Sequence, residues 1–225
     1  FQTSVINTGE LLYYQLPTLA GKPLLVYISQ SGESAEIVRL LQDIPSNVTC
    51  MGIGNEEDSS LARMTKEIFL SFAGREEMTS TKTFTAISLV TYILGWSLAG
   101  KWDNNKIRLA KDLAAGVNNQ LSHAEKDAEE IFDFLGEVNF LQFIGRGPSI
   151  SNVYQSELMF KEASKTAAAG ALGGEFRHGP MEMVNKDFKA IMFAANGESY
   201  ALNEKMACDI SNYNGKLVLD RKSVV

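Results

Sequence analysis

Several features that define whole classes of protein are missing from this chain of 225 residues. Its two cysteines, Cys50 and Cys208, are too few for a disulfide framework and lack the spacing of a metal site. No run approaches the ~18 apolar residues of a membrane span, and the first residues lack the basic segment of a signal peptide. A net charge of -6 offers no basic footprint for nucleic acid or an anionic membrane. We therefore expect a cytoplasmic protein without nucleic-acid or membrane partners.

What is present is typical of a globular α/β protein, with 45% hydrophobic and 21% charged residues. Short apolar runs such as residues 24–28 alternate with segments of helical spacing, which indicates parallel sheets covered on both faces. We predict two doubly wound parallel-sheet subdomains, flavodoxin-like with three αβα layers. The first covers residues 1–103 and the second covers residues 137–225. A helical connector with one buried apolar stripe, over residues 104–136, joins them.

Two stretches of the chain resemble each other. Residues 22–43 and residues 189–209 each contain an apolar strand, a Gly-Glu-Ser turn and a helix. We interpret them as two copies of one strand–helix–strand unit. The alternative is the chance similarity that any two such units can show. Each copy lacks flanking elements that the other has. If they are copies, a leading and a trailing segment are expected outside these 225 residues.

A turn rich in hydroxyl groups follows the first apolar strand. Its sequence is Ser29-Gln30-Ser31-Gly32-Glu33-Ser34, and a helix follows it. Ligands of open parallel sheets bind at the carboxyl ends of strands, and a helix N-terminus offers free N–H groups to an anion. Three hydroxyls add neutral donors, and the glycine allows close backbone approach. We predict a site for a phosphate monoester, with an ordinary N-cap as the alternative.

Three other turns bear on this prediction. Residues 79–83 also precede a helix, where Ser80 could either add a hydroxyl to the same site or act in a helix cap. The second copy has Ala194-Ala195-Asn196 in place of the serines, which indicates a different role for that copy. Gly145-Arg146-Gly147 follows a strand but lacks the third glycine of a dinucleotide fingerprint. We therefore expect no nicotinamide cofactor.

The candidates for proton transfer are few because the chain has only two histidines. His123 lies in a polar helical segment and is interpreted as a surface residue. His178 lies in a turn bounded by glycines and a proline, where it could transfer protons or simply bond loop carbonyls. Glu162 and Glu157 lie on the preceding helix. Most helical glutamates are surface groups, so the residues alone favour neither strongly.

Four separated motifs together resemble the double sugar-isomerase (SIS) domain family. They are the hydroxyl-rich turn, Ser80-Thr81-Lys82, Lys161-Glu162, and Glu175-Phe176-Arg177-His178-Gly179-Pro180. Their order and spacing are similar to those of the isomerase half of glucosamine-6-phosphate synthases. The resemblance covers essentially the whole chain, and the combination is more specific than any single motif.

The resemblance implies a role for each matching residue. The sugar phosphate is bound by Ser29, Gln30, Ser31, Ser34 and Ser80. Glu162 moves a proton between two neighbouring sugar carbons, and His178 assists ring opening from across a dimer interface. The implied partners are a small sugar phosphate and a second copy of the chain, in a homodimer with a shared active site. The implied chemistry needs no metal and no cofactor.

The chain also departs from the synthases, in which a lysine lies three positions before the catalytic glutamate. Here that position is Met159. We therefore expect a phosphosugar isomerase or an amino-sugar-phosphate isomerase or deaminase. A fructosamine-6-phosphate deglycase is the first alternative and a non-catalytic phosphosugar sensor is the second. A structural subunit of a larger synthase is a third.

Overall fold

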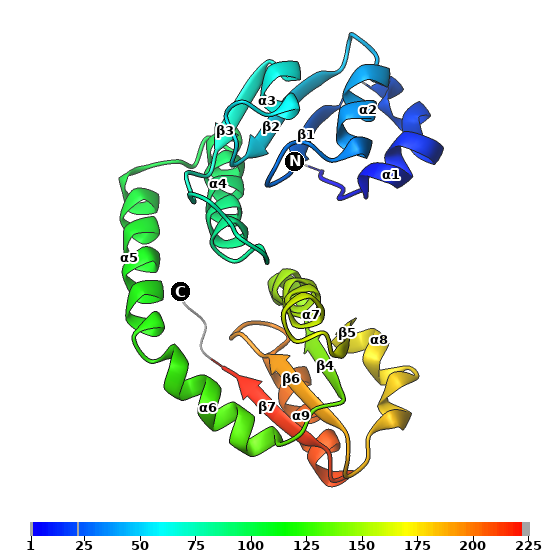
Figure 1. Ribbon diagram of the computed structural model, residues 1–225, viewed down its shortest axis with the longest axis vertical. Helices are drawn as coiled ribbons and strands as arrows, with labels where there is room; N and C mark the ends of the chain where they lie inside the picture. The colour runs from blue at the N-terminus through cyan, green and yellow to red at the C-terminus, as the bar shows by residue number, and fades with distance from the viewer. Residues whose placement is uncertain (1, 22, 222–225) are drawn as a thin grey trace. The chain divides into compact units, whose positions relative to one another are not determined.

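The computed structural model describes residues 2–21 and 23–221, and Figure 1 shows their helices and strands. Residues 1, 22 and 222–225 lie outside the described residues. They include the first residue of the first predicted subdomain and the last residues of the second. The chain divides into two compact units, Phe1–Ile107 and Arg108–Val225. Each contains one wholly parallel sheet with helices packed on it, which confirms the predicted α/β class.

The first unit is built on a three-stranded sheet in the order β1-β2-β3. A π-helical and a 3-10 segment, η1 and η2, precede the first strand. Its elements are α1 (Thr8–Glu10), η1 (Leu11–Gln15), η2 (Leu16–Gly21), β1 (Leu24–Ile28), α2 (Ala35–Asp43), β2 (Thr49–Gly54), α3 (Ser60–Met64), β3 (Glu67–Leu70) and α4 (Lys82–Leu98).

Side chains alternate between the two faces of this sheet because successive strand residues point in opposite directions. Leu25 and Tyr27 of β1 join a core with residues of η1, η2, α2 and α3. Val26, between them, packs instead on Ile53 of β2 and Ile87 of α4. The first face is therefore covered by several elements, and the second by α4.

The second unit is built on a four-stranded sheet in the order β5-β4-β6-β7. Every neighbouring pair in it is parallel. Its elements are α6 (Ala124–Leu135), β4 (Phe140–Gly145), η3 (Gly147–Ser149), α7 (Ile150–Ser164), β5 (Ala167–Leu172), α8 (Gly173–Arg177), η4 (Pro180–Met183), β6 (Lys189–Phe193), α9 (Tyr200–Asn212) and β7 (Lys216–Asp220).

Helices cover both faces of this second sheet. Ile144 and Met192 pack with residues of α8 and α9. The neighbouring residues Phe143 and Ile191 pack on the opposite face, with residues of α6 and α7. Phe176, on α8, is fully buried in the first of these clusters. The helices α7 and α8 thus lie on opposite faces of one sheet, which decides how the candidate catalytic residues can be used.

The predicted connector contains two helices, α5 (Asn104–Leu121) and α6. The boundary between the compact units falls inside α5. The apolar stripe predicted there is buried only in part. No described residue of α5 is buried, whereas Leu135 of α6 lies in the core of the second unit. The spacing predicts a helix correctly but does not say whether anything packs on it. Throughout the described residues, each helix is too short or too polar to cross a bilayer.

Candidate functional site

The hydroxyl-rich turn lies at the carboxyl end of β1, where a parallel sheet binds its ligands. The backbone N–H of Ser29 donates to the carbonyl of Ile53, at 3.0 Å, so the strand pairing continues one residue past β1. The helix α2 begins directly after Ser34. Ala35 and Glu36, its first two residues, have N–H groups with no acceptor within the helix. The turn therefore combines hydroxyl and backbone donors.

Each of the three serine hydroxyls accepts a hydrogen bond from a nearby backbone N–H. The oxygen of Ser29 accepts from Gly32 at 3.1 Å and that of Ser31 from Glu33 at 3.3 Å. Ser34 accepts from Ile37 at 3.4 Å and is the N-cap of α2, so the capping alternative holds for this serine. The described residues provide no acceptor for the three hydroxyl protons. These protons remain available to an anion.

The conformation of this turn requires glycine at position 32. Gly32 has a φ of 63°, in the left-handed region that disfavours other residues. A Cβ atom there would lie 2.5 Å from the hydroxyl oxygen of Ser59 and 2.9 Å from Cβ of Leu61. Ser59 is buried, and Leu61 donates its N–H to the Gly32 carbonyl. Ser59 and Leu61, at the start of α3, thus pack directly against the backbone of the turn at Gly32.

Glu33 fastens the same turn to the start of α3, a contact that the sequence patterns did not reveal. Its carboxylate accepts from the N–H of Ser60 at 2.6 Å and from the Ser60 hydroxyl at 2.8 Å, and Arg63 lies 3.8 Å away. The hydroxyl bond, followed by the backbone bond from Ser60, lowers the pKa of Glu33. The negative charge that Glu33 brings to the turn is therefore paired with donors of α3, from Ser60 and Arg63.

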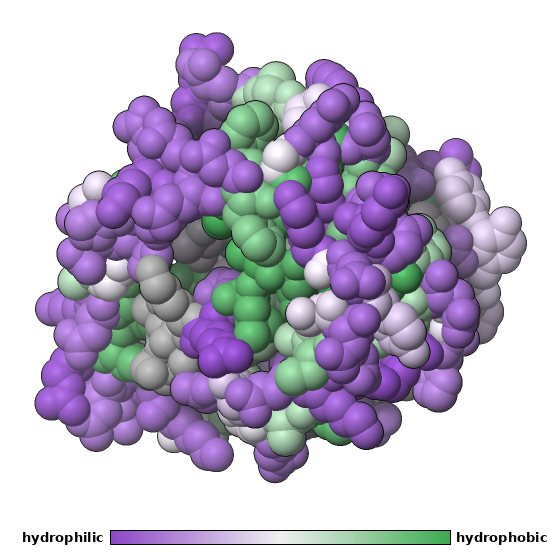
Figure 2. Space-filling view, turned by 90° about the horizontal axis from the view of Figure 1, so that it is seen from below, coloured by the Kyte–Doolittle hydropathy of each residue, from purple (hydrophilic) through white to green (hydrophobic). Residues whose placement is uncertain are grey.

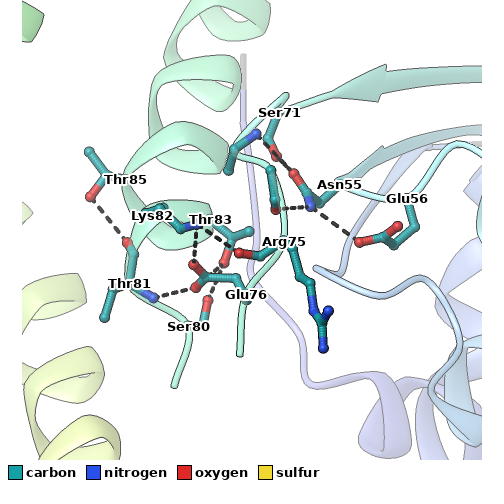
Figure 3. A network of polar contacts seen from close by, with 12 residues as sticks. Asn55, Glu56, Ser71, Arg75, Glu76, Ser80, Thr81, Lys82, Thr83 and Thr85 are labelled. Atoms are coloured by element: carbon teal, nitrogen blue, oxygen red, sulfur yellow. Dashed lines mark hydrogen bonds and ion pairs between the residues drawn. The ribbon is translucent and has the colours of Figure 1, made fainter. Parts of the chain in front are cut away.

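Asn55, just past β2, connects the turn with the segment that follows β3. Its N–H donates to the carbonyl of Gln30 at 3.1 Å. Its side-chain oxygen accepts from the Ser71 hydroxyl at 2.7 Å and from the Ala73 N–H at 3.0 Å, as Figure 3 shows in part. Through its backbone N–H and its side chain, Asn55 thus ties together the segments that leave all three parallel strands at one edge of the sheet.

Ser80 lies in a second polar turn at this edge, organised by a carboxylate. The Ser80 hydroxyl lies 2.5 Å from that of Thr83, which donates to Glu76 at 3.0 Å (Figure 3). The N–H of Thr81 donates to the same carboxylate at 2.5 Å, and Lys82 lies 4.0 Å from it. Burial alone would raise the pKa of Glu76, but these hydrogen bonds and Lys82 hold the pKa below its ordinary value. Glu76 was not predicted.

The two carboxylates of α7 are in different situations. Glu157 accepts from the Gly170 N–H at 2.8 Å and pairs with Lys161, so it joins α7 to β5. Glu162 is half-buried, and its carboxylate has no hydrogen bond or ion pair within the part of the chain that the structure describes. Spacing on one helix could not separate them. These contacts show that Glu157 holds α7 against β5, whereas no described residue binds the carboxylate of Glu162.

His178 follows the single turn of α8, as the bounding glycines and proline predicted. Its N–H donates to the Glu175 carbonyl at 3.0 Å, and the 3-10 segment η4 begins two residues later. Its side chain is exposed, and the imidazole has no hydrogen bond among the described residues. The alternative that His178 serves to bond loop carbonyls is therefore not seen in this structure.

The fold of the second unit does not bring Glu162 and His178 together. Glu162 is near the end of α7, and His178 ends α8, which packs on the opposite face of the sheet. The six residues of β5 also separate them along the chain, since Glu162 precedes this strand and His178 follows it. Within one copy of the chain, these two groups therefore lie on different sides of the sheet.

Each unit of the described chain has a hollow, and neither one is lined by a residue of the hydroxyl-rich turn itself. In the first unit a cavity of about 580 Å³ is lined by Ile28 and one side of α4. In the second, a hollow of about 770 Å³ lies over β6 and β7. Apolar side chains also reach the surface between polar ones, as one face of the molecule shows in Figure 2. The described residues contain no group of three side chains placed to hold a metal ion.

Comparison with known proteins gives these features a family context. Residues 1–95 match the SIS domain family, a match that includes the hydroxyl-rich turn and Ser80 but ends before Glu162. A glutamine–fructose-6-phosphate aminotransferase (isomerizing) from Geobacillus kaustophilus is 34% identical over 195 residues, covering 84% of this chain and 32% of that protein. The chain is homologous to that part of the aminotransferase. It spans about a third of the length of the curated relatives it matches.

Solved structures have the same fold. The C-terminal domain of glucosamine-fructose-6-phosphate aminotransferase from Francisella tularensis matches with a TM-score of 0.75 and 26% identity, over 87% of this chain and 57% of that one. A glucosamine-6-phosphate deaminase from Thermotoga maritima matches with a TM-score of 0.73 over 96% of this chain and 66% of that one. Its 19% identity supports the fold alone.

Proposed function

We propose, from the SIS domain at residues 1–95, that this chain binds a sugar phosphate and isomerises it. The observation that carries the proposal is the hydroxyl-rich turn. Its three serine oxygens are held by backbone N–H groups, and their three O–H protons find no acceptor among the described residues. A phosphate ester supplies the acceptor oxygens that these donors lack.

The phosphate would be held by neutral donors at the N-terminus of α2. Ser29, Gln30, Ser31 and Ser34 belong to the turn itself, and Ser80 belongs to the second turn at the same edge of the sheet. The helix N-terminus adds a partial positive charge, which favours an anion. Glu33 is engaged by Ser60 and Arg63, which reduces its repulsion of the anion.

Glu162 is the proposed base. Its carboxylate would remove the proton from the carbon next to the sugar carbonyl and return it to the former carbonyl carbon. The hydroxyl proton of the carbon that was deprotonated moves to the former carbonyl oxygen. An aldose and a ketose thus interconvert without a net change in atoms. A positioned base contributes about 10² to 10⁴ in rate. Binding the distant phosphate holds the reacting carbons in place.

His178 is proposed to assist ring opening from a second copy of the chain. The support is geometric, because α7 and α8 lie on opposite faces of one sheet and the imidazole is exposed. A homodimer whose sites each use Glu162 of one copy and His178 of the other satisfies this arrangement. The protein would then be active only as a dimer.

Release of an amine is the second candidate, favoured by Met159. The resemblance to synthases predicts a lysine at this position, and methionine cannot supply its charge. The same Glu162 would then act on an amino-sugar or fructosamine phosphate, as a deaminase or deglycase. Assaying amine release from fructosamine 6-phosphates and glucosamine 6-phosphate, beside interconversion of plain hexose phosphates, separates these reactions.

The test of the base compares Glu162→Gln with Glu125→Gln, an exposed glutamate of α6. We expect Glu162→Gln to lower turnover by about 10² or more while phosphosugar binding by calorimetry persists. Glu125→Gln should change neither quantity. Unchanged turnover in Glu162→Gln would reject the base. Binding without turnover by the unmodified protein, across the whole substrate panel, would favour a sensor.

A further inference from the structure

Arg146 is the strongest polar feature that the proposed function does not use. It follows β4 in the Gly145-Arg146-Gly147 segment, and parity along the strand directs it to the face covered by α8 and α9. Its Nε atom is buried and has no hydrogen-bond partner among residues 2–21 and 23–221. No ion pair with Arg146 is found in the described ranges. A buried donor on a charged group is costly when unpaired, and an anion bound at the terminal nitrogens would offset part of that cost by pairing with the guanidinium charge.

Two consecutive glycines accommodate the guanidinium. A Cβ atom at Gly173 would lie 2.7 Å from Nε of Arg146 and 2.9 Å from its Cζ, and one at Gly174 would lie 3.7 Å from a terminal nitrogen. Any other residue at position 173 would displace the guanidinium. The start of α8 is therefore shaped to receive this side chain against its backbone.

The charges around Arg146 are also unbalanced. Burial, and then the nearby charge of Arg177, lower the pKa of Arg146. Arg177 has its own acidic partner, since it donates to Asp209 at 2.7 Å. Arg177 thus has a paired carboxylate within the described residues and Arg146 has none, so an anion beside Arg146 would offset the repulsion between the two guanidinium groups.

The place of Arg146 in the sheet is one where ligands bind. The neighbouring strands β4 and β6 lie at the centre of the order β5-β4-β6-β7. The chain leaves β4 toward β5 and leaves β6 toward β7, so their connections diverge. A crevice opens at the carboxyl ends of such a pair, and Arg146 is the residue directly after β4.

We infer that Arg146 is the centre of a second anion site, in the second unit, that takes a phosphate or carboxylate group. This goes beyond the sugar-phosphate site at the hydroxyl-rich turn and does not depend on it. The turn after β6 has Ala194 and Asn196 at the places of Ser29 and Ser31 in the first turn. The guanidinium of Arg146, directly after the adjacent strand β4, supplies donors instead, and its planar fork can bind two oxygens of either a carboxylate or a phosphate.

The first test is a titration of the unmodified protein with inorganic phosphate and, separately, with acetate. The readout is the NMR signal of the Arg146 Nε–H, assigned with Arg146→Gln or by selective labelling. We expect this signal to shift saturably, whereas that of Arg108, which is exposed on α5, should not. A response to phosphate alone, to acetate alone or to both identifies the ligand chemistry. No response to either anion overturns the inference.

The second test separates this site from the turn of the first unit. Arg146→Gln should weaken anion binding in the second unit about tenfold or more, because it removes a charge-assisted contact. Ser31→Ala should leave the Arg146 titration unchanged, and Arg108→Gln is the matched charge control. Binding to this variant is followed through the backbone amide signals of Gly173 and Gly174, which lie beside the guanidinium. If Arg146→Gln binds as tightly as the unmodified protein by these signals, the inference is wrong. If that variant does not fold, the titration of the unmodified protein still decides.

Discussion

The two strand–helix–strand segments of this protein, β1-α2-β2 and β6-α9-β7, share one architecture but differ at the turn. Both pairs of strands are parallel. In the first, three serine oxygens organise the turn, and Ser34 caps α2. In the second, Ala194 and Asn196 stand in the places of Ser29 and Ser31, and among the described residues Ser199 makes no side-chain cap. The difference teaches that the strand–helix–strand frame forms without the hydroxyls, so their presence in the first unit calls for a functional reason.

The helices that follow these turns differ in the core as well. Ile37 is the first buried residue of α2, and Leu40 follows three positions later. Asn203 is the first buried residue of α9, and Met206 follows at the same spacing. Asn203 is 2% exposed, and its side-chain oxygen finds no hydrogen-bond partner in the part of the chain that the structure describes. The second unit thus carries a buried polar atom where the first has a methyl group.

The largest effect is expected from reversing the polarity of these two core residues, Ile37 and Asn203. Ile37→Asn should lower the free energy of unfolding by about 3–5 kcal/mol, because it opens space and buries an unpaired amide. Asn203→Leu should raise the free energy of unfolding by about 1 kcal/mol, because it removes an unsatisfied oxygen. Urea denaturation measures both. A loss of stability in Asn203→Leu would show that the amide has a partner in solution.

Gly32 gives the next largest effect and tests whether its turn is tightly supported. Gly32→Ala should lower the free energy of unfolding by about 2–4 kcal/mol, through left-handed strain and contact with Ser59 and Leu61. Gly147 has a φ of 56° but nothing within 4 Å of its Cβ position. Gly147→Ala should therefore cost only the strain, about 1–2 kcal/mol. Equal losses in thermal or urea denaturation would contradict the packing argument.

The serine hydroxyls should matter for binding more than for folding. Ser31→Ala removes a neutral donor, so we expect phosphosugar affinity to fall about tenfold, as one hydrogen bond predicts. Calorimetry with a hexose phosphate measures this change. Ser199→Ala, at the turn of the second unit, is the matched control and should leave that affinity unchanged. If both variants bind equally well, the distinction between the two turns fails.

The smallest effect concerns acid stability of the first unit. The pKa of Glu76 is lowered in the folded state, so its contribution is present above the unfolded pKa, about 4.3, and is lost as pH falls through the lower folded pKa. We expect Glu76→Gln to flatten the decline of stability below about pH 4.3. Glu125→Gln should leave that decline unchanged. Urea midpoints measured across this pH range provide the check, and parallel curves for both variants would contradict it.

Much of the frame could be predicted from local pattern. Apolar runs and the hydroxyl-rich turn predicted β1 and α2 because strand and cap signals reside in neighbouring residues. The site was predictable only where its parts are similarly local. Glu76 and Asn55 were missed because their partners lie in segments that spacing does not connect. The stripe on α5 was assigned to a core because periodicity indicates a face and not what covers it.

By itself, the sequence determined the parallel α/β class, the position of the serines after a strand, and the exposed turn at His178. Only the tertiary structure decided that Glu157 joins α7 to β5 while the Glu162 carboxylate is unpaired among the described residues. It also decided that α7, which carries Glu162, and α8, which His178 follows, lie on opposite faces of one sheet. The physical reason is that turns and caps arise from contacts between near neighbours. The pairing of strands and the face on which a helix packs arise from burial across the whole unit.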